Sequence, residues 1–402
     1  MFKCKDSTYL FLLSAVAVCF FAINAPEDFG DVGLSVYTGT VALKKARAHG
    51  GDMLDFFKGD PQGTTFVYHI FGHPLSIVAT HIFSKIVGLT TRTVIWLSLI
   101  ASFAGIITAF YIGKILCDSL FGFLFGFLLT VNVLNNVVVQ TGTPYYAFCL
   151  PLTLGTFLSF LRLHKNDNPA GRVARQILFS AFLFALAAFH TYTYATFGFF
   201  FSFLFLVSLF IYQKVIGRKQ ILDAGNGFKF LSIKFYLFFP ILIVVFYFGL
   251  ATAWEKHNHV PLGTVIKNVS KEMGVRNEIL PWEERQKKLP WIITKAIEVI
   301  FVDIDKNHHF SQWGVHGDTA ITGAPALSFF EALFFIAGIG YCLIRRKPLH
   351  LFCLSTIVFV ALGMVFSFNA HAPRLYFFAI PILTLISAVG ARECLSLASE
   401  KS

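Results

Sequence analysis

The chain has 402 residues, of which 56% are hydrophobic and only 14% are charged, and its mean hydropathy is +0.67. This composition excludes a single water-soluble globule, because such a domain needs more polar surface than these residues supply. The sequence therefore predicts an integral membrane protein. The formal net charge of +11 is considered below together with the arrangement of the spans.

Apolar runs near the length of a bilayer follow one another along the chain. A hydrocarbon core about 30 Å thick needs roughly 20 apolar residues of helix to cross it. The run from Ile177 to Tyr212 is too long for one span, so we divide it at the polar residues 190–194. The expected spans are residues 8–25, 93–116, 119–140, 145–163, 177–190, 193–213, 235–253, 325–344, 351–368 and 375–391. We expect an all-α polytopic protein of about ten transmembrane helices, forming one domain over residues 1–402.

Two long polar segments, residues 26–92 and 254–324, interrupt these spans. Lys and Arg in short loops resist translocation, whereas long loops cross largely regardless of charge. With a cytoplasmic N-terminus, the short external loops carry only Arg374, and the other cations of the short connections are cytoplasmic. We therefore expect both termini inside and both long loops outside, which explains the net charge without nucleic acid. A cleaved signal peptide at the first span is an open alternative.

Cofactor signals are weak. Seven cysteines are scattered, with none in either long loop, so neither a disulfide framework nor a zinc site is predicted. Four residues of the second loop suit a divalent cation but lack a recognisable spacing; they are Asp303, Asp305, His308 and Asp318. We expect no cofactor, with a divalent cation as the open alternative. No phosphate-cradling glycine loop is found, so an external enzyme would need a lipid-borne substrate.

The two external loops differ in character. The first contains helical patterns over residues 32–49 and 64–87, and the first of these patterns suits a helix lying in the membrane interface. Acidic residues follow the first span closely, where a carboxylate can reach a lipid head group. The second loop is rich in Trp and His and begins at Trp254. Its rings suit either membrane anchoring or a platform on which sugar faces stack, and both interpretations stay open.

Three segments, in this order along the chain, resemble GT-C type polytopic glycosyltransferases, the superfamily that includes protein O-mannosyltransferases and lipid A aminoarabinose transferases. They are residues 31–39, with Asp31, Gly33, Tyr37 and Gly39; residues 72–75 with 83–88 and Arg92; and residues 371–381, with His371, Arg374, Tyr376 and Pro381. The resemblance implies a GT-C-like fold and transfer of a sugar from a polyprenyl phosphate to an acceptor hydroxyl, with inversion. The implied partners are the lipid-linked donor, membrane lipid, and a glycan, lipid or protein acceptor.

The resemblance also implies roles for individual residues. Asp31 is the candidate general base, because a positioned carboxylate can take the proton of an acceptor hydroxyl. Arg374 is the candidate clamp on the departing lipid phosphate, which a guanidinium can hold with two hydrogen bonds. Asp28 is the candidate second carboxylate, since residues 140–146 lack the acid that many members carry there. The further substrate-binding candidates are His371, His73, Lys85 and Tyr37. His73 departs from the family pattern, which often has adjacent prolines preceded by Lys.

Other interpretations stay open for several of these residues. The alternative role for Asp31 is to cap the N-terminus of a helix. The alternative role for Arg374 is to mark the membrane boundary, with its long side chain reaching from the apolar region to water. Glu331 lies inside a predicted span, where facing lipid would be costly, so we expect it to face protein or a cavity. The rival function is a transporter or flippase of a lipid-linked glycan, which needs a polar path at mid-membrane. A chain without large soluble domains suits a bacterial cytoplasmic membrane.

Overall fold

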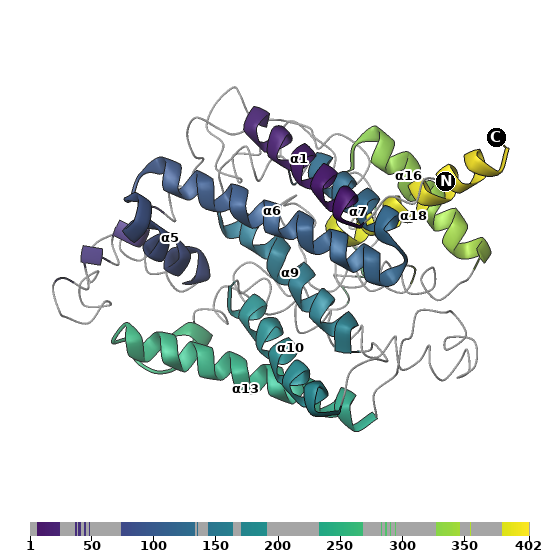
Figure 1. Cartoon of the computed structure of the whole chain (residues 1–402). Coiled ribbons are helices and arrows are strands. Elements are labelled where there is room, and N and C mark those ends of the chain that lie inside the picture. Colours follow the sequence, from purple (N-terminus) through teal and green to yellow (C-terminus); the bar gives the residue numbers. More distant parts are fainter. Residues whose placement is uncertain are drawn as a thin grey trace.

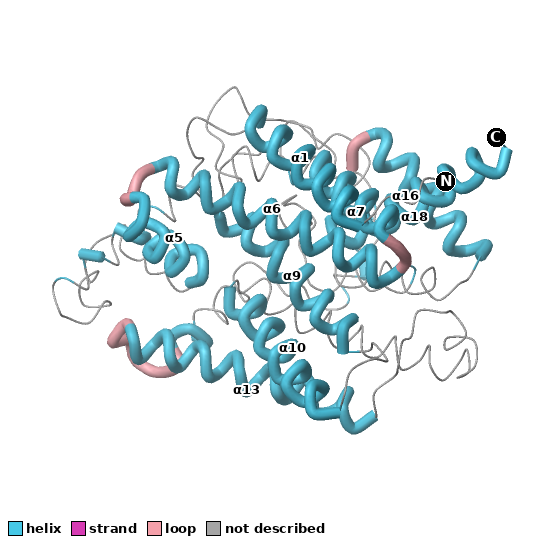
Figure 2. The backbone as a smooth tube through the Cα atoms, in the orientation of Figure 1, coloured by secondary structure: helices cyan, strands magenta, loops and turns pink. Residues whose placement is uncertain are grey.

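The structure, a computed structural model (Figure 1), is helical throughout its described part. It describes residues 6–24, 74–132, 144–163, 170–190, 233–267, 327–345 and 380–401, with the single positions 37, 39–41, 44, 45, 48, 135, 283, 286, 287, 290, 294 and 354. Figure 2 shows the described connections at residues 88–90, 117–118 and 258–263 as short turns at helix ends.

Among the described residues, five helices are long and apolar enough to cross a membrane. They are α1 (Asp6–Asn24), α6 (Thr91–Leu116), α10 (Ala170–His190), α13 (Ile233–His257) and α18 (Ile380–Lys401). The shorter or partly described apolar helices are α5 (Pro74–Val87), α7 (Ser119–Val131), α9 (Pro144–Leu163) and α16 (Phe329–Arg345). The protein is therefore a multi-pass helical membrane protein. The predicted spans at 193–213 and 351–368 lie outside the described residues, apart from Leu354.

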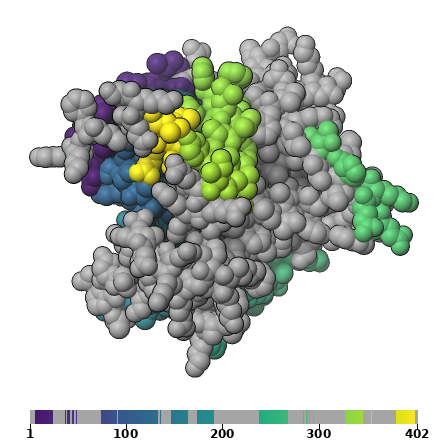
Figure 3. Space-filling model, turned by 90° about the vertical axis from the view of Figure 1, so that its right-hand side faces the viewer, coloured from purple at the N-terminus to yellow at the C-terminus, as the bar shows by residue number. Residues whose placement is uncertain are grey.

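The described helices pack as a row with two additions. Along the row, each helix contacts the next in the order α16, α18, α7, α6, α9, α10 and α13 (Figure 1). Helix α1 lies across α6 and α7, and α5 packs against α6, α9 and α10. Figure 3 shows α16 and α18 side by side on one face of the molecule. The chain thus brings its late helices back beside α1 and α7.

Two apolar cores hold the row together. The larger lies among α1, α6, α7, α9, α16 and α18 and includes the fully buried Phe110, Phe121 and Phe125. The smaller joins α5, α9, α10 and α13, where the rings of Phe160 and Phe239 lie 5.9 Å apart. The outer faces stay apolar as well. Large side chains there are exposed because lipid, rather than water, is their expected neighbour.

Helix α7 is shorter than the sequence predicts. We expected a span over residues 119–140, yet the helix ends at Val131 and Asn132 is its extended C-cap residue. Asp118 starts the helix by accepting a hydrogen bond from the backbone N–H of Phe121 at 2.8 Å. Thirteen residues of helix cover only about 20 Å. The prediction was wrong because the apolar run continues past Asn132, whose side chain forms tertiary hydrogen bonds that hydropathy does not reveal.

Glycines allow the closest helix contacts. A Cβ atom at Gly338 of α16 would lie 2.2 Å from the carbonyl oxygen of Ile386 in α18. A Cβ atom at Gly390 would lie 2.0 Å from the carbonyl oxygen of Phe334. These contacts involve backbone atoms, which cannot rotate away. Small residues let membrane helices approach in this manner, since packing drives their association in lipid.

The α16–α18 contact gives the first testable prediction. We expect Gly338→Ala to lower the free energy of unfolding by about 1–3 kcal/mol, because the new methyl group overpacks the crossing. Gly340→Ala is the matched control on the same helix, since nothing lies within 4 Å of a Cβ atom there. Thermal unfolding of both variants in one detergent measures the difference. Equal midpoints for the two variants would contradict the close crossing.

Candidate functional site

Pairs of charged side chains show which helix ends lie together at one end of the bundle. Asp6, at the start of α1, accepts hydrogen bonds from Lys114 of α6 and Ser119 of α7. Arg392 of α18 pairs with Asp118 at 2.5 Å. We call this the charged end. Helices α1 and α7 therefore start here, whereas α6 and α18 approach it with their C-terminal halves.

The opposite end, which we call the site end, collects the helix termini nearest to the predicted chemistry. Helices α1 and α7 end there, and α18 begins there at Ile380. Asp31 follows Asn24 by seven residues, and Arg374 precedes Ile380 by six. Both candidate residues are thus close in sequence to helix termini of the site end, and both lie outside the described residues.

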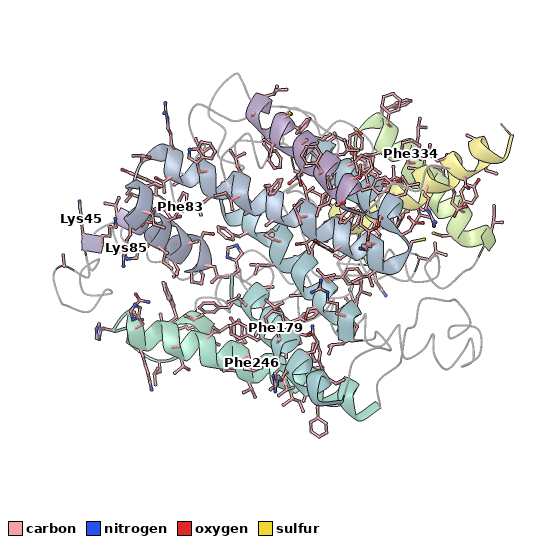
Figure 4. The ribbon with its side chains drawn as sticks, viewed as in Figure 1. Lys45, Phe83, Lys85, Phe179, Phe246 and Phe334 are labelled. Carbon is pink, nitrogen blue, oxygen red and sulfur yellow. The ribbon has the colours of Figure 1, made fainter. Side chains whose placement is uncertain are left out.

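Two of the predicted site residues belong to the described part of the chain. Tyr37 is half-buried, and Lys85 is exposed in the last turn of α5. Figure 4 shows Lys85 at the same edge of the molecule as the exposed Lys45. The remaining predicted site residues lie outside the described residues; they are Asp28, Asp31, His73, His371 and Arg374. Their roles stay predictions.

The turn after α5 fixes the position of this helix against α6. Gly88 has a φ of +81°, and its N–H donates to the carbonyl oxygen of Ser84 at 3.0 Å. Thr90 and Thr93 form a capping box at the start of α6, and the Thr93 hydroxyl donates to the carbonyl oxygen of Gly88 at 2.7 Å. Glycine suits this left-handed C-cap position. Lys85 is therefore carried by a well-anchored helix rather than by a free loop.

The end of α13 is closed by a buried carboxylate. Glu255 is 2% exposed and accepts hydrogen bonds from the backbone N–H groups of Gly263 and Val265 at 2.9 and 2.7 Å. Gly263 has a φ of +88° and His259 a φ of +54°, so the chain reverses within a few residues. The helix runs to His257, slightly past the point where we expected the second long loop to begin.

Trp254 is neither a membrane anchor nor an exposed platform. Its side chain is 7% exposed and packs in the smaller core. The same core contains Ile77 of α5 and Val265 beyond α13. Both sequence interpretations are therefore wrong for this residue, because tertiary packing covers the indole from its outer side. The other tryptophans of the second loop lie outside the described residues.

The most polar buried cluster of the described chain lies at the site end. Glu331, in the first turn of α16, is fully buried, which confirms that it faces protein. The side-chain amide of Asn132 donates to both of its carboxylate oxygens, at 3.1 and 3.3 Å. The backbone N–H and hydroxyl of Ser328 donate to Oε2, each at 3.1 Å. Ser387 of α18 donates to the backbone carbonyl of Glu331 at 3.0 Å.

The chain after α7 continues this network. The backbone N–H of Asn135 donates to Oδ1 of Asn132 at 3.1 Å, and the Asn135 amide donates to the carbonyl oxygen of Leu129 at 3.0 Å. Oδ1 of Asn135 is buried without a hydrogen-bond partner among the described residues. Sequence reasoning missed Asn132 and Asn135, because the contact with Glu331 joins positions 199 residues apart, and the asparagines within an apolar run were their only signal. It also missed Ser328, for which the Ser-x-x-Glu spacing of a capping box was a local signal.

No metal centre is found in the described part of the chain. Among these residues, no three His, Cys, Asp or Glu side chains gather closely enough to hold an ion. The cation candidates of the second loop, Asp303, Asp305, His308 and Asp318, lie outside the described residues.

Solved structures share this arrangement of helices. ArnT from Cupriavidus metallidurans, bound to undecaprenyl phosphate, matches with a TM-score of 0.58 and 11% identity, over 96% of this chain and 60% of that chain. The oligosaccharyltransferase of Archaeoglobus fulgidus, in complex with Zn and sulfate, matches with a TM-score of 0.52 and 12% identity, over 98% and 49%. The chain has a GT-C fold. This confirms the fold that the sequence resemblance implies.

A second structure of the archaeal enzyme AglB, with an inhibitory peptide and a dolichol-phosphate, matches with a TM-score of 0.53 and 13% identity, over 98% of this chain and 51% of that chain. The chain thus spans about half to three fifths of the length of these GT-C enzymes. No protein-family model and no curated protein sequence matches the chain. At these identities the likeness concerns the fold, and the activity of this chain needs its own argument.

The turn after α13 can be tested directly. We expect Glu255→Ala to destabilise residues 258–267, because each backbone N–H that is left buried and unsatisfied costs about 1–3 kcal/mol. Hydrogen–deuterium exchange of this segment should become faster, while exchange at residues 88–93 stays unchanged. Lys267→Ala removes an exposed side chain from the same segment and is the control. Unchanged protection in Glu255→Ala would rule out the closing role of the carboxylate.

Proposed function

We propose that the chain is a glycosyltransferase that takes a sugar from a polyprenyl-phosphate donor at the extracytoplasmic face of a membrane. The observation that carries this proposal is the GT-C fold over 96% of the chain, shared with an enzyme bound to undecaprenyl phosphate. The ordered motifs at residues 31–39, 72–92 and 371–381 add to it. The acceptor is a hydroxyl group of a glycan, lipid or protein.

In this proposal Asp31 is the general base. An acceptor hydroxyl is a poor nucleophile until its proton is removed in the transition state, and a positioned carboxylate contributes about 10²- to 10⁴-fold in rate. Attack at the anomeric carbon from the face opposite the phosphate forms the new glycosidic bond while the bond to the phosphate oxygen breaks. The anomeric centre is inverted, and the proton passes to the carboxylate. Asp28 is the candidate for a second acidic group.

Cationic side chains receive the leaving group. The lipid phosphate gains negative charge as the glycosidic oxygen departs, and Arg374 can hold it through two charge-assisted hydrogen bonds. Lys85 and Lys45 place two further exposed cations at one edge of the molecule (Figure 4). His73, His371 and Tyr37 complete the proposed substrate-binding set. A donor with a phosphate head group suits this balance of charge.

A transporter or flippase is the weaker interpretation of the same fold. Transport needs polar or charged groups along a path at mid-membrane. In the described helices, the buried carboxylates Glu255 and Glu331 lie in terminal turns. The buried hydroxyls of Thr80, Ser98 and Thr130 donate to carbonyl groups of their own helices. This part of the chain therefore favours chemistry at one face. We place that face outside the cell, in a bacterial cytoplasmic membrane, with both termini inside.

Substitution of the candidate base tests the proposal. We expect Asp31→Asn to lower the turnover number for sugar transfer by about 10²- to 10⁴-fold, because the amide cannot accept the acceptor proton. The measurement is transfer from a panel of radiolabelled polyprenyl-phosphate sugars by the purified, folded protein. Asp60→Asn removes another carboxylate of the same loop outside the motif and should leave turnover unchanged.

Two results would contradict this assignment. Wild-type turnover in Asp31→Asn would remove Asp31 from the base role. Thiol labelling of Asp31→Cys from the cytoplasmic side would place the residue on the wrong face. Movement of label across sealed vesicles, without a new glycosidic bond, would favour the transporter.

The proposed clamp makes a separate prediction. We expect Arg374→Lys to lower turnover about 10- to 100-fold, because the ammonium keeps the charge but loses the paired hydrogen bonds to phosphate. Arg346→Lys, in a predicted cytoplasmic segment, is the control and should behave as the wild type. Steady-state transfer kinetics at saturating donor distinguish the two. Equal turnover in both variants would leave Arg374 as a boundary residue only.

A further inference from the structure

Glu331 is an unusual residue for a membrane-helix bundle, because it buries a carboxylate completely. Its interactions with Ser328 form the reciprocal pattern of a capping box, since the N–H of Glu331 also donates to the Ser328 hydroxyl at 3.3 Å. A cap alone would account for those contacts. It does not account for the amide of Asn132, which approaches both carboxylate oxygens from the end of α7.

Glu331 connects the start of α16 to the end of α7 through its side chain, and to α18 through its backbone carbonyl. Asn132 joins it to the end of α7 and, through its own Oδ1, to the backbone of Asn135. Ser387 joins the backbone of Glu331 to α18, seven residues beyond Ile380. The sequence from residue 132 to residue 143, which follows α7, contains no acidic residue. The carboxylate that organises its beginning therefore comes from a helix that starts almost two hundred residues later.

We propose that Glu331 and Asn132 are positioning residues for the glycosyl transfer proposed above. Their side chains hold the end of α7 against the start of α16 at the site end, next to the point where Ser387 of α18 binds the backbone of Glu331. In the sequence, Asp31 follows the last residue of α1 by seven positions and Arg374 precedes Ile380 of α18 by six, and α1 packs against α7. A base and a clamp that come from opposite ends of the chain work together only if these helix ends are fixed. Misplacement by about 1 Å can cost about 10²-fold in rate.

Single substitutions test the pair. We expect Glu331→Gln and Asn132→Asp each to lower kcat about 10²-fold, with a much smaller change in the donor KM. In Glu331→Gln, the side-chain amide at position 331 faces the side-chain amide of Asn132. The aspartate places two carboxylates in contact, and like charges there disfavour the native geometry. Purified variants are compared by kcat per folded molecule, with the folded fraction taken from gel filtration and thermal unfolding.

The decisive experiment is a double variant, Asn132→Asp with Glu331→Gln, which we call the exchanged double variant. In it the carboxylate is at position 132 and the amide is at position 331. In this double variant, the oxygen of the glutamine side chain at position 331 can accept hydrogen bonds from Ser328. The amide of the same side chain can donate to the aspartate at position 132. The other aspartate oxygen can still accept from the N–H of Asn135. We expect kcat to recover to within about threefold of the wild type, since an amide–carboxylate hydrogen bond is formed again in the reverse direction and the contacts with Ser328 and Asn135 are kept.

A pair at the charged end provides the matched control. Asp118→Asn weakens the ion pair with Arg392, which also joins α7 to α18. A loss of helix–helix contact there should lower the unfolding midpoint but leave kcat of the folded protein unchanged. If Asp118→Asn lowers kcat as much as Glu331→Gln does, general destabilisation explains both. The positioning role is then overturned.

A second measurement does not depend on catalysis. Hydrogen–deuterium exchange of residues 129–135 should become faster in each single variant and return to the wild-type rate in the exchanged double variant. Absence of transfer by the wild type with every donor would refute the proposed function, while the exchange data would still test the pair. Wild-type kcat in either single variant, or a double variant that regains protection but not kcat, would overturn the inference.

Discussion

The organising constraint is that a polar group inside a lipid-embedded bundle must find its partner within the protein. The described ion pairs and buried carboxylates therefore lie at or near helix ends, where helices meet. Asp6 and Asp118 bind α1, α6, α7 and α18 together at one end. At the other end, the side chain of Glu331 binds α16 to α7, and its backbone carbonyl accepts a hydrogen bond from Ser387 of α18. These two clusters fix which parts of the helices lie together at each end.

Between the two ends, the bundle is held by apolar packing that depends on side-chain volume and pattern more than on the identity of each residue, except at the glycines of the α16–α18 crossing. Aromatic rings fill the two cores, and glycines set the close crossing of α16 and α18. Such packing tolerates wide substitution when volume and pattern are kept. This explains how a chain that is only 11–13% identical to ArnT and AglB retains their fold.

The sequence predicted the long apolar helices well, because hydropathy and bilayer thickness alone determine them. Residues 93–116 were expected and Thr91–Leu116 is observed. The end of α7 and the environment of Trp254 were mispredicted, because each depends on tertiary contacts. The prediction that Glu331 faces protein was correct, and it was based on the cost of exposing a carboxylate to lipid. Its partner Asn132 was beyond prediction, since no local pattern connects positions 199 residues apart. The roles of Asp31 and Arg374 still rest on the resemblance alone.

Stability alone is a poor reason for a buried carboxylate at residue 331. Removing a charged group from water costs several kcal/mol, and apolar side chains of similar volume often replace buried ionic groups without loss of stability. The capping contacts with Ser328 need only a polar side chain at the third helical position. The amide of Asn132, in contrast, meets both oxygens, and glutamine at position 331 would need a carboxylate at position 132 to form an equivalent pair. A hydrogen bond between an amide and a carboxylate fixes the end of α7 in orientation as well as in distance, which is what the proposed positioning role requires.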